Sequence, residues 1–388
     1  MLLFQPQQAR SFLFHQQAGT ASLESVAVPD WHRFSETAQR EGVSAILFHN
    51  ITNHHLKDLI PQDCCRKLSN QYNANLRRNL LIIGALREVL AALQEAGIPC
   101  IVLKGIALAE CVYKNIALRG MNDVDILVRK VDLLNTDNHL SSLGYTSRDS
   151  SVTKVIHNPA GYLSSLEYRS NDPSPLNLHV HWHPVNTSVP GTMFAEKIDI
   201  CRLWKNATMT NVADSQALML SPEHLIIYLC EHAMRVGHSF DRMILVCDIF
   251  YTIKTFKNII DWDFIIEESR QFNLSRFVYY GLSIVRHHTS LDIPNDSISK
   301  MRPLDISRGE RYFLKLQFQN QRIRGTSYFI YLAMNKRILE KIRFITRTFF
   351  PPAQILLQRQ YRKDSVFSKS LYLLRIMEIL AHLKNFYK

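Results

Sequence analysis

Two stretches decide the fold of this 388-residue chain: Ile101-Val-Leu-Lys-Gly-Ile-Ala-Leu-Ala-Glu-Cys-Val-Tyr113 and Leu118-Arg-Gly-Met-Asn-Asp-Val-Asp-Ile-Leu-Val128. The apolar run that opens the first stretch predicts a buried strand, and the residues after its glycine predict a helix. The second stretch ends in another predicted strand. Because side chains alternate between the two faces of a strand, Asp123 and Asp125 are expected on one face.

These residue types in this order point to phosphate chemistry. Two neighbouring carboxylates repel each other, and a divalent cation with a preference for oxygen ligands, such as Mg²⁺, relieves that repulsion. Lys104 and Gly105 form a turn between strand and helix, where backbone N–H groups and a lysine can meet phosphate oxygens. Arg119 can add a charge-assisted contact. Asp-x-Asp and Lys-Gly are each common alone, so the prediction depends on their joint order.

The residues that carry a family resemblance are Leu103, Lys104, Gly105, Leu108, Ala109, Tyr113, Arg119, Asp123, Asp125, Ile126, Leu127 and Val128. Further matching positions are Gly144, Tyr145, His181, Trp182, Leu220–Glu223, His232, Asp248 and Asp261–Asp263. Over roughly residues 75–290 the sequence resembles the uncharacterised nucleotidyltransferase family of the polymerase-β-like superfamily. The resemblance implies an α+β fold: a polymerase-β-like core of a mixed sheet with flanking helices, plus N- and C-terminal helical regions.

The resemblance also implies a reaction and its residues. Such enzymes transfer a nucleoside monophosphate from an NTP, for example ATP, to an acceptor hydroxyl or phosphate. Asp123 and Asp125 would be catalytic and hold Mg²⁺, with Mn²⁺ as an alternative. Lys104, Gly105 and Arg119 would bind the nucleotide. The acceptor stays open: a protein, a sugar, another small molecule or RNA.

The position of the third carboxylate departs from the family pattern, because His179 stands there. One interpretation is that His179 acts as a metal ligand or general base, and is therefore catalytic. Others are a weakened enzyme that only binds nucleotide or serves as a scaffold, a His-rich transition-metal site, and simple packing of His179, His181 and His183. Glu167 on the neighbouring predicted strand is an alternative carboxylate.

Helical spacing and turn residues predict four regions: an N-terminal helical region at 1–96, a catalytic core at 97–213, a helical domain at 214–300 and a basic helical region at 301–388. Within the first two regions the patterns predict a helix at 64–96 and a hairpin of strands 162–168 and 176–182, joined by residues 171–175. Within the helical domain they predict helices at 222–236, 241–256, 262–270 and 275–289. The C-terminal region should contain three helices in 307–386, broken at Pro351–Pro352.

The charge is concentrated at one end. Of 46 Lys/Arg and 34 Asp/Glu residues, the region 301–388 holds 18 and 5, which leaves a nearly neutral body. Between Lys336 and Phe350 the pattern predicts a basic amphipathic helix. It could lie on an anionic membrane, bind RNA, dock an acidic partner, or pack its apolar face on the body.

Other features set the context. Seven cysteines without a CxxC pair indicate reduced thiols, and the N-terminus does not resemble a signal peptide, so a cytoplasmic location is expected, with peripheral membrane contact as an option. The family resemblance implies a bacterial-type enzyme. His224, His232 and His238 are expected to cap or pack, with His232 a candidate for the cleft. Asp248, an acid among apolar residues, needs a buried partner, for which Arg242 and His232 are candidates.

Overall fold

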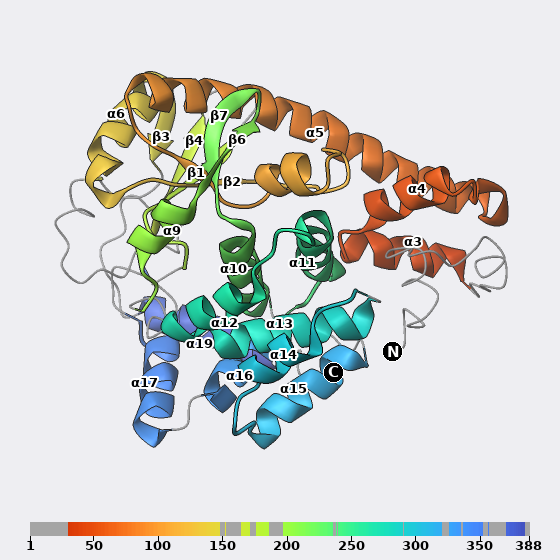
Figure 1. The fold of residues 1–388 in the computed structure, drawn as a ribbon, viewed down its shortest axis with the longest axis vertical. Helices are drawn as coiled ribbons and strands as arrows, with labels where there is room; N and C mark the ends of the chain where they lie inside the picture. The colour runs from red at the N-terminus through yellow and green to blue at the C-terminus, as the bar shows by residue number, and fades with distance from the viewer. Residues whose placement is uncertain are drawn as a thin grey trace.

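A computed structural model describes residues 30–147, 152, 164–170, 176–185, 197–235, 238, 240–289, 291–319, 326–334, 337–351, 356 and 370–384. The turn expected at 171–175, the first two residues of the hairpin expected from residue 162, and Pro352 lie outside this part. In the described residues the molecule combines a mixed sheet with many helices, as expected for the α+β class (Figure 1).

Seven strands form one sheet in the order β3-β4-β5-β2-β1-β7-β6. Their bounds are β1 Ile101–Val102, β2 Val124–Leu127, β3 Tyr145–Ser147, β4 Ser165–Ser170, β5 Asn177–His181, β6 Thr208–Val212 and β7 Ser215–Met219. β2 lies at the centre, antiparallel to β1 and parallel to β5. Every residue of β1 and β2 is buried, which agrees with their near-continuous apolar sequence.

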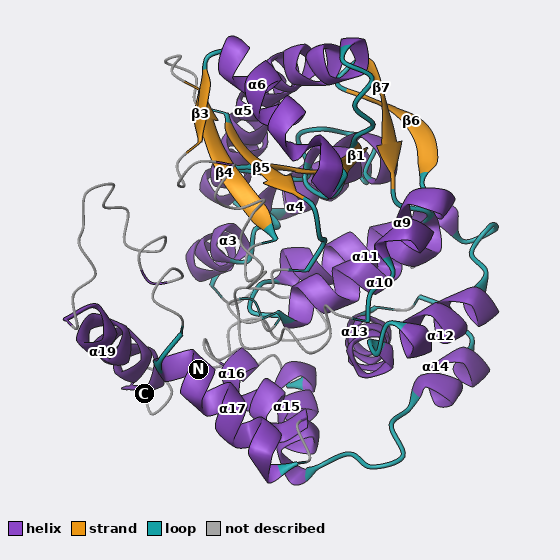
Figure 2. Ribbon diagram, turned by 90° about the vertical axis from the view of Figure 1, so that its left-hand side faces the viewer, coloured by secondary structure: helices purple, strands orange, loops and turns teal. Residues whose placement is uncertain are grey.

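Helices surround the sheet in layers (Figures 1 and 2). The N-terminal helices are α3 Trp31–Arg40, α4 Ser44–Asn53 and α5 Gln62–Glu95, and α6 Leu133–Ser142 follows β2. After α9 Ile200–Asn206 and the last strands come α10 Pro222–Met234, α11 Met243–Phe256, α12 Trp262–Gln271, α13 Ser275–His288 and α14 Asn295–Met301. Figure 2 shows the sheet with α5 and α6 in the upper half and α10–α13 below.

The central helix α10 is buried on all sides, since twelve of its thirteen residues are buried. A helix with apolar residues all round belongs in a core. It begins with Ser221, whose side chain accepts a hydrogen bond from the N–H of His224, and with Pro222 at the first helical position. The capping signal in the sequence is therefore confirmed. In the view of Figure 2, α10 lies below the sheet.

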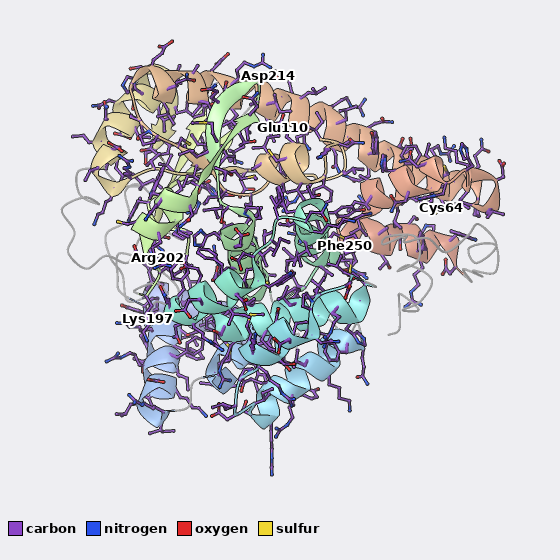
Figure 3. All side chains as sticks on the ribbon, in the orientation of Figure 1. Cys64, Glu110, Lys197, Arg202, Asp214 and Phe250 are labelled. Carbon is purple, nitrogen blue, oxygen red and sulfur yellow. The ribbon has the colours of Figure 1, made fainter. Side chains whose placement is uncertain are left out.

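The helical pattern expected beyond residue 214 begins later, because residues 215–219 form β7 rather than a helix. Neither β6 nor β7 was expected from the sequence. The segment Ser-Gln-Ala-Leu-Met has little intrinsic strand preference, and its conformation is imposed by pairing with β1 and β6. Figure 3 shows Glu110 and Asp214 close to α5. Side chains on both sides contact the turn between β6 and β7. Glu110 accepts a 2.8 Å hydrogen bond from the Ala213 N–H, and Arg87 pairs with Asp214.

The C-terminal region contains four described helices where three were expected: α15 Arg308–Phe318, α16 Thr326–Met334, α17 Ile338–Phe349 and α19 Ser370–Lys384. The helix α17 ends just before Pro351, as the proline predicts. Within the described part of the chain, no helix has both the length and the hydrophobicity needed to cross a bilayer.

Candidate active site

The first element of the site is the turn after β1. Leu103 N–H donates to the Asp125 carbonyl at 3.0 Å, which continues the pairing of β1 with β2. Gly105 follows with a φ of +64°, a conformation that favours glycine. This turn directs Lys104 toward β2, and its Nζ lies 2.6 Å from Oδ2 of Asp125. The lysine and the carboxylate predicted from the sequence therefore meet directly.

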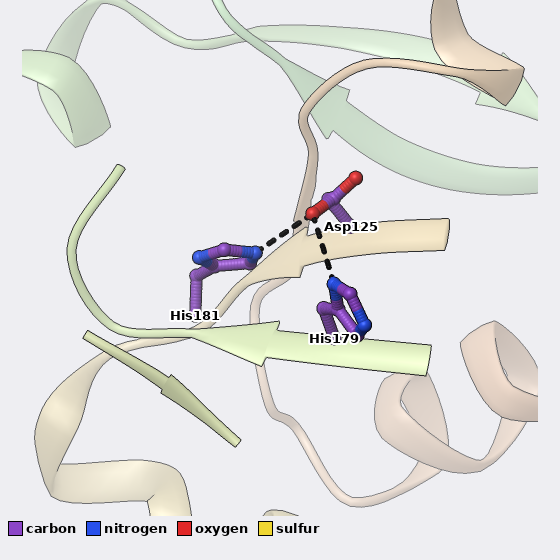
Figure 4. A group of neighbouring side chains, drawn as sticks. All are labelled: Asp125, His179 and His181. Carbon is purple, nitrogen blue, oxygen red and sulfur yellow. Dashed lines mark hydrogen bonds and ion pairs between the residues drawn. The ribbon is translucent and has the colours of Figure 1, made fainter. Parts of the chain in front are cut away.

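Two histidines from β5 reach the same carboxylate (Figure 4). Asp125 is the register partner of His179, so both project from one face of the sheet. Nε2 of His181 is 2.8 Å from Oδ1 of Asp125. Nδ1 of His179 is 3.6 Å from that oxygen and also 3.6 Å from Oδ2 of Asp123. His179 thus faces both aspartates, whereas the ring of His183 bonds to the backbone of Val185.

Burial and charge set the protonation states. Burial would raise the pKa of Asp125, but Lys104 and the two histidines outweigh it, and the pKa lies well below its usual range. Burial would lower the pKa of His179, but Asp125, Asp123 and Glu167 raise it overall. For His181, burial lowers the pKa more than the neighbouring Asp125 raises it, so the pKa of His181 is lowered. The site therefore combines an ionised carboxylate with one histidine that binds a proton readily and one that stays neutral.

Glu167 is the register partner of His179 on the other side, across β4 and β5. Asp125, His179 and Glu167 therefore form a row over three neighbouring strands. Glu167 pairs with Arg169 at 3.4 Å, and its charge contributes to the raised pKa of His179. Of the two candidates for the third position, His179 is the one that lies against the aspartate pair.

Three buried polar atoms near Lys104 have no hydrogen-bond partner within the described residues: Nδ1 of His181, the hydroxyl of Tyr228 and Nδ1 of His232. Tyr228 and His232 come from α10. Burial, followed by the charge of Lys104, lowers the pKa of His232 well below its usual value. Burial raises the pKa of Tyr228 to about 12. Tyr228 carried no signal in the sequence, because a tyrosine in an apolar helix is indistinguishable from a core residue.

The donor atoms fit a divalent cation. One oxygen of Asp125 and one ring nitrogen from each of His179 and His181 lie within 4.8 Å of one another. Asp123 adds a second carboxylate beside them. Carboxylate oxygens suit Mg²⁺, whereas imidazole nitrogens suit Mn²⁺ and Zn²⁺ better. Lys104 holds the remaining oxygen of Asp125, so its ammonium and a bound cation share the charge of one carboxylate.

Arg119 has a different partner from the one expected. Its guanidinium donates to both carboxylate oxygens of Asp248, at 3.3 and 3.0 Å, and Tyr113 donates to the same group at 2.9 Å. Asp248 therefore has the buried partner that its apolar surroundings require, but that partner is neither Arg242 nor His232. Burial would lower the pKa of Arg119, but Asp248 raises it, with a smaller contribution from Asp123.

Asparagines of α5 fasten the loop that leads to Asp123. Asn79 is fully buried and donates to the carbonyls of Ile116 and Arg119, at 2.5 and 2.9 Å. Asn75 donates to the carbonyl of Ala117 at 3.0 Å. A Cβ on Gly120 would lie only 2.7 Å from Oδ1 of Asn75, so glycine permits this close approach. Neither asparagine carries a signal in the sequence, because their partners are 37 to 42 residues away.

Comparison with known proteins decides the family. A family model described as an uncharacterised nucleotidyltransferase matches residues 28–290. The chain belongs to the uncharacterised nucleotidyltransferase family. The match includes both aspartates, Lys104 and the two histidines of the site, and it extends the resemblance seen in the sequence to the N-terminal helices. A comparison with curated proteins found no match.

Proposed function

We propose that this family member transfers a nucleoside monophosphate from an NTP to an acceptor hydroxyl or phosphate. The observation that supports this most is the meeting of Lys104, His179 and His181 at Asp125, with Asp123 alongside. A basic side chain, two carboxylates and an imidazole are then within reach of one phosphorus centre. The family assignment supports the same class of reaction.

Each residue has a role in this proposal. Lys104 binds phosphate oxygens of the NTP, and its turn positions the nucleotide beside β2. Asp123 and Asp125 would hold Mg²⁺ or Mn²⁺, which would supply positive charge to the phosphates. His179, whose Nδ1 lies 3.6 Å from both aspartates, would be a third group at the metal ion. Arg119 acts through its pair with Asp248, which orients the loop before Asp123.

The test is transfer of α-labelled ATP, GTP, CTP and UTP into a cell lysate with Mg²⁺ or Mn²⁺, comparing wild type with Asp125→Asn. We expect the variant to lose about 100-fold or more in labelling, because the charge that organises the site is gone. Asp63→Asn, an exposed carboxylate on α5, is the matched control and keeps wild-type labelling. Nucleotide binding without transfer by wild type would favour the silent, scaffold-like alternative. Label in RNA would favour an RNA-modifying enzyme.

We also propose that the C-terminal helices place the enzyme on an anionic membrane. The helix α17 packs through Phe344 and Thr348 and leaves Ile338, Leu339, Ile342 and Ile345 exposed. Leu339 is 75% exposed and Ile338 69%. The helix α19 exposes Leu373, Leu374, Met377 and Leu380. Basic residues next to exposed apolar ones are typical of helices that bind anionic bilayers.

This second proposal is tested by sedimentation with vesicles of phosphatidylcholine alone or with phosphatidylserine. Replacing Leu339 and Ile342 by serine is expected to abolish binding to the anionic vesicles, because it removes apolar side chains that would enter the bilayer. Both side chains are exposed, so the fold should tolerate the change. The matched control replaces Leu80 and Leu81, exposed on α5, by serine. Equal binding of all three proteins would contradict the proposal.

A further inference from the structure

A cleft of about 840 Å³ lies between α5, the loop before Asp123 and the start of α11. This volume falls within the range of roughly 300–1,000 Å³ that is usual for small-molecule sites. Four arginines line it: Arg77 and Arg78 from α5, Arg119 from the loop, and Arg242 just before α11. None of its lining residues is acidic.

The arginines differ in how they are engaged. Arg119 is paired with Asp248. Arg77, Arg78 and Arg242 are exposed, and within the described residues none of them forms an ion pair with a carboxylate. Such unpaired guanidinium groups around a concave surface favour an anion, and phosphate suits their planar fork. Although the body of the protein is nearly neutral, this part of its surface is strongly basic.

The cleft lies directly beside the candidate active site. Its wall includes Gly120, Met121 and Asn122, the three residues that precede Asp123 in the chain. Met121 also contacts the other side of the site, because its Sδ lies 3.6 Å from where a Cβ on Gly105 would be. A molecule held by the arginines would therefore lie against the loop that leads to Asp123. Lys104, which pairs with Asp125, is separate from this set.

We propose that this cleft binds the acceptor, and that the acceptor is a small molecule carrying a phosphate group. The inference rests on the proposed nucleotidyl transfer. The acceptor phosphate binds to Arg77, Arg78 and Arg242, and its hydroxyl faces the α-phosphorus of the NTP. A bond forms between the hydroxyl oxygen and that phosphorus, the bond from the phosphorus to the bridging oxygen breaks, and pyrophosphate leaves. The hydroxyl proton leaves to solvent water.

The experiment measures binding to the full-length protein by calorimetry with two probes. Inorganic phosphate represents the acceptor, and α,β-methylene ATP with Mg²⁺ represents the donor. The test variant is Arg77→Ala/Arg78→Ala. The control is Arg66→Ala/Lys67→Ala, which removes the same charge from adjacent exposed positions of the same helix outside the cleft. Arg242→Ala provides a single substitution from a different element.

We expect phosphate to bind wild type even when the donor analogue is saturating. Its affinity should fall about tenfold or more in the Arg77/Arg78 variant and in Arg242→Ala, and less than about twofold in the control, because only the cleft arginines hold it. Affinity for the donor analogue should change by less than about twofold in all variants.

Three results would overturn the proposal. If the Arg77/Arg78 variant loses affinity for the donor analogue as strongly as for phosphate, the cleft holds the triphosphate of the NTP. Unchanged phosphate binding in the variant shows that the cleft binds no phosphate. If a short single-stranded RNA binds through these arginines and displaces phosphate, the acceptor is a nucleic acid. If phosphate binds as expected but the donor analogue does not bind at all, the proposed transfer fails while the anion site stands.

Discussion

Asp125 is the residue on which the candidate site depends, because it is almost completely buried and still ionised. A buried carboxylate stays ionised only when positive or hydrogen-bonding groups surround it. Lys104 and His181 supply these contacts directly, and His179 lies slightly farther away. His179 lies 3.6 Å from a carboxylate oxygen of each aspartate, so it faces both of them.

The identity of residue 179 should set the preference for metal. Because imidazole binds Mn²⁺ better than Mg²⁺, and carboxylate suits Mg²⁺, we expect His179→Asp to raise the ratio of activity with Mg²⁺ to activity with Mn²⁺ by about tenfold. Label transfer with each metal over a concentration series measures this ratio. The control is His183→Asp, since His183 lies outside the cluster. An unchanged ratio would remove His179 from the metal site.

The histidines buried near α10 should make stability sensitive to acid. Burial, followed by nearby basic groups, lowers the pKa of His238 from 6.5 to about 4. Between these pH values the unfolded chain binds a proton that the folded protein does not, so the free energy of unfolding falls as the pH drops. Urea unfolding at pH 7 and pH 5 should show a smaller loss for His238→Gln than for wild type. The exposed His32→Gln should behave as wild type, and equal losses in all three proteins would contradict the prediction.

At the scale of elements, the site is assembled by contacts between β1, β2 and β5 and by the hold of α5 on one loop. The strands bring Lys104, the aspartates and the histidines together through their register. The helix α5 then fixes the loop at 115–120 through side-chain hydrogen bonds to backbone carbonyls. The helix α5 thereby helps to determine where Asp123 lies.

Removal of the Asn79 side chain should weaken both stability and activity. Asn79→Ala leaves two loop carbonyls without their donor, which we expect to cost about 1–3 kcal/mol in the free energy of unfolding. Because the loop leads to Asp123, label transfer should also fall. The control is Asn73→Ala, an exposed asparagine on the same helix. Urea unfolding and transfer assays measure the two effects. A fully stable, active Asn79 variant would show that the loop does not need the hydrogen bonds from Asn79.

At the scale of the whole molecule, the C-terminal region is attached to the body by a buried polar cluster. Glu310 at the start of α15 accepts hydrogen bonds from Tyr280 at 2.6 Å and from the backbone of Ser307 at 2.8 Å, and it pairs with Arg276. Tyr280 and Arg276 belong to α13. One buried carboxylate thus links the basic region to two side chains of the body.

Replacing this carboxylate should loosen the C-terminal helices. In Glu310→Ala, Arg276 and Tyr280 lose their shared buried partner, so we expect a loss of about 3–5 kcal/mol in the free energy of unfolding. Limited trypsin digestion should cut first in the region after residue 305, which is rich in lysine and arginine. The exposed Glu267→Ala is the control. If digestion starts elsewhere at the same rate as in wild type, the cluster does not secure this region.

The local sequence determined the central strands, most helices from α5 to α13 and the pair Asp123 and Asp125, because periodicity, caps and a compact motif act over a few residues. It could not determine β7, whose conformation depends on pairing with β1. It also could not assign Asp248 to Arg119, 129 residues away, or place Asn79 on the loop and Arg77 and Arg242 in one cleft. These relations depend on which distant surfaces pack together, so only the tertiary structure decided them.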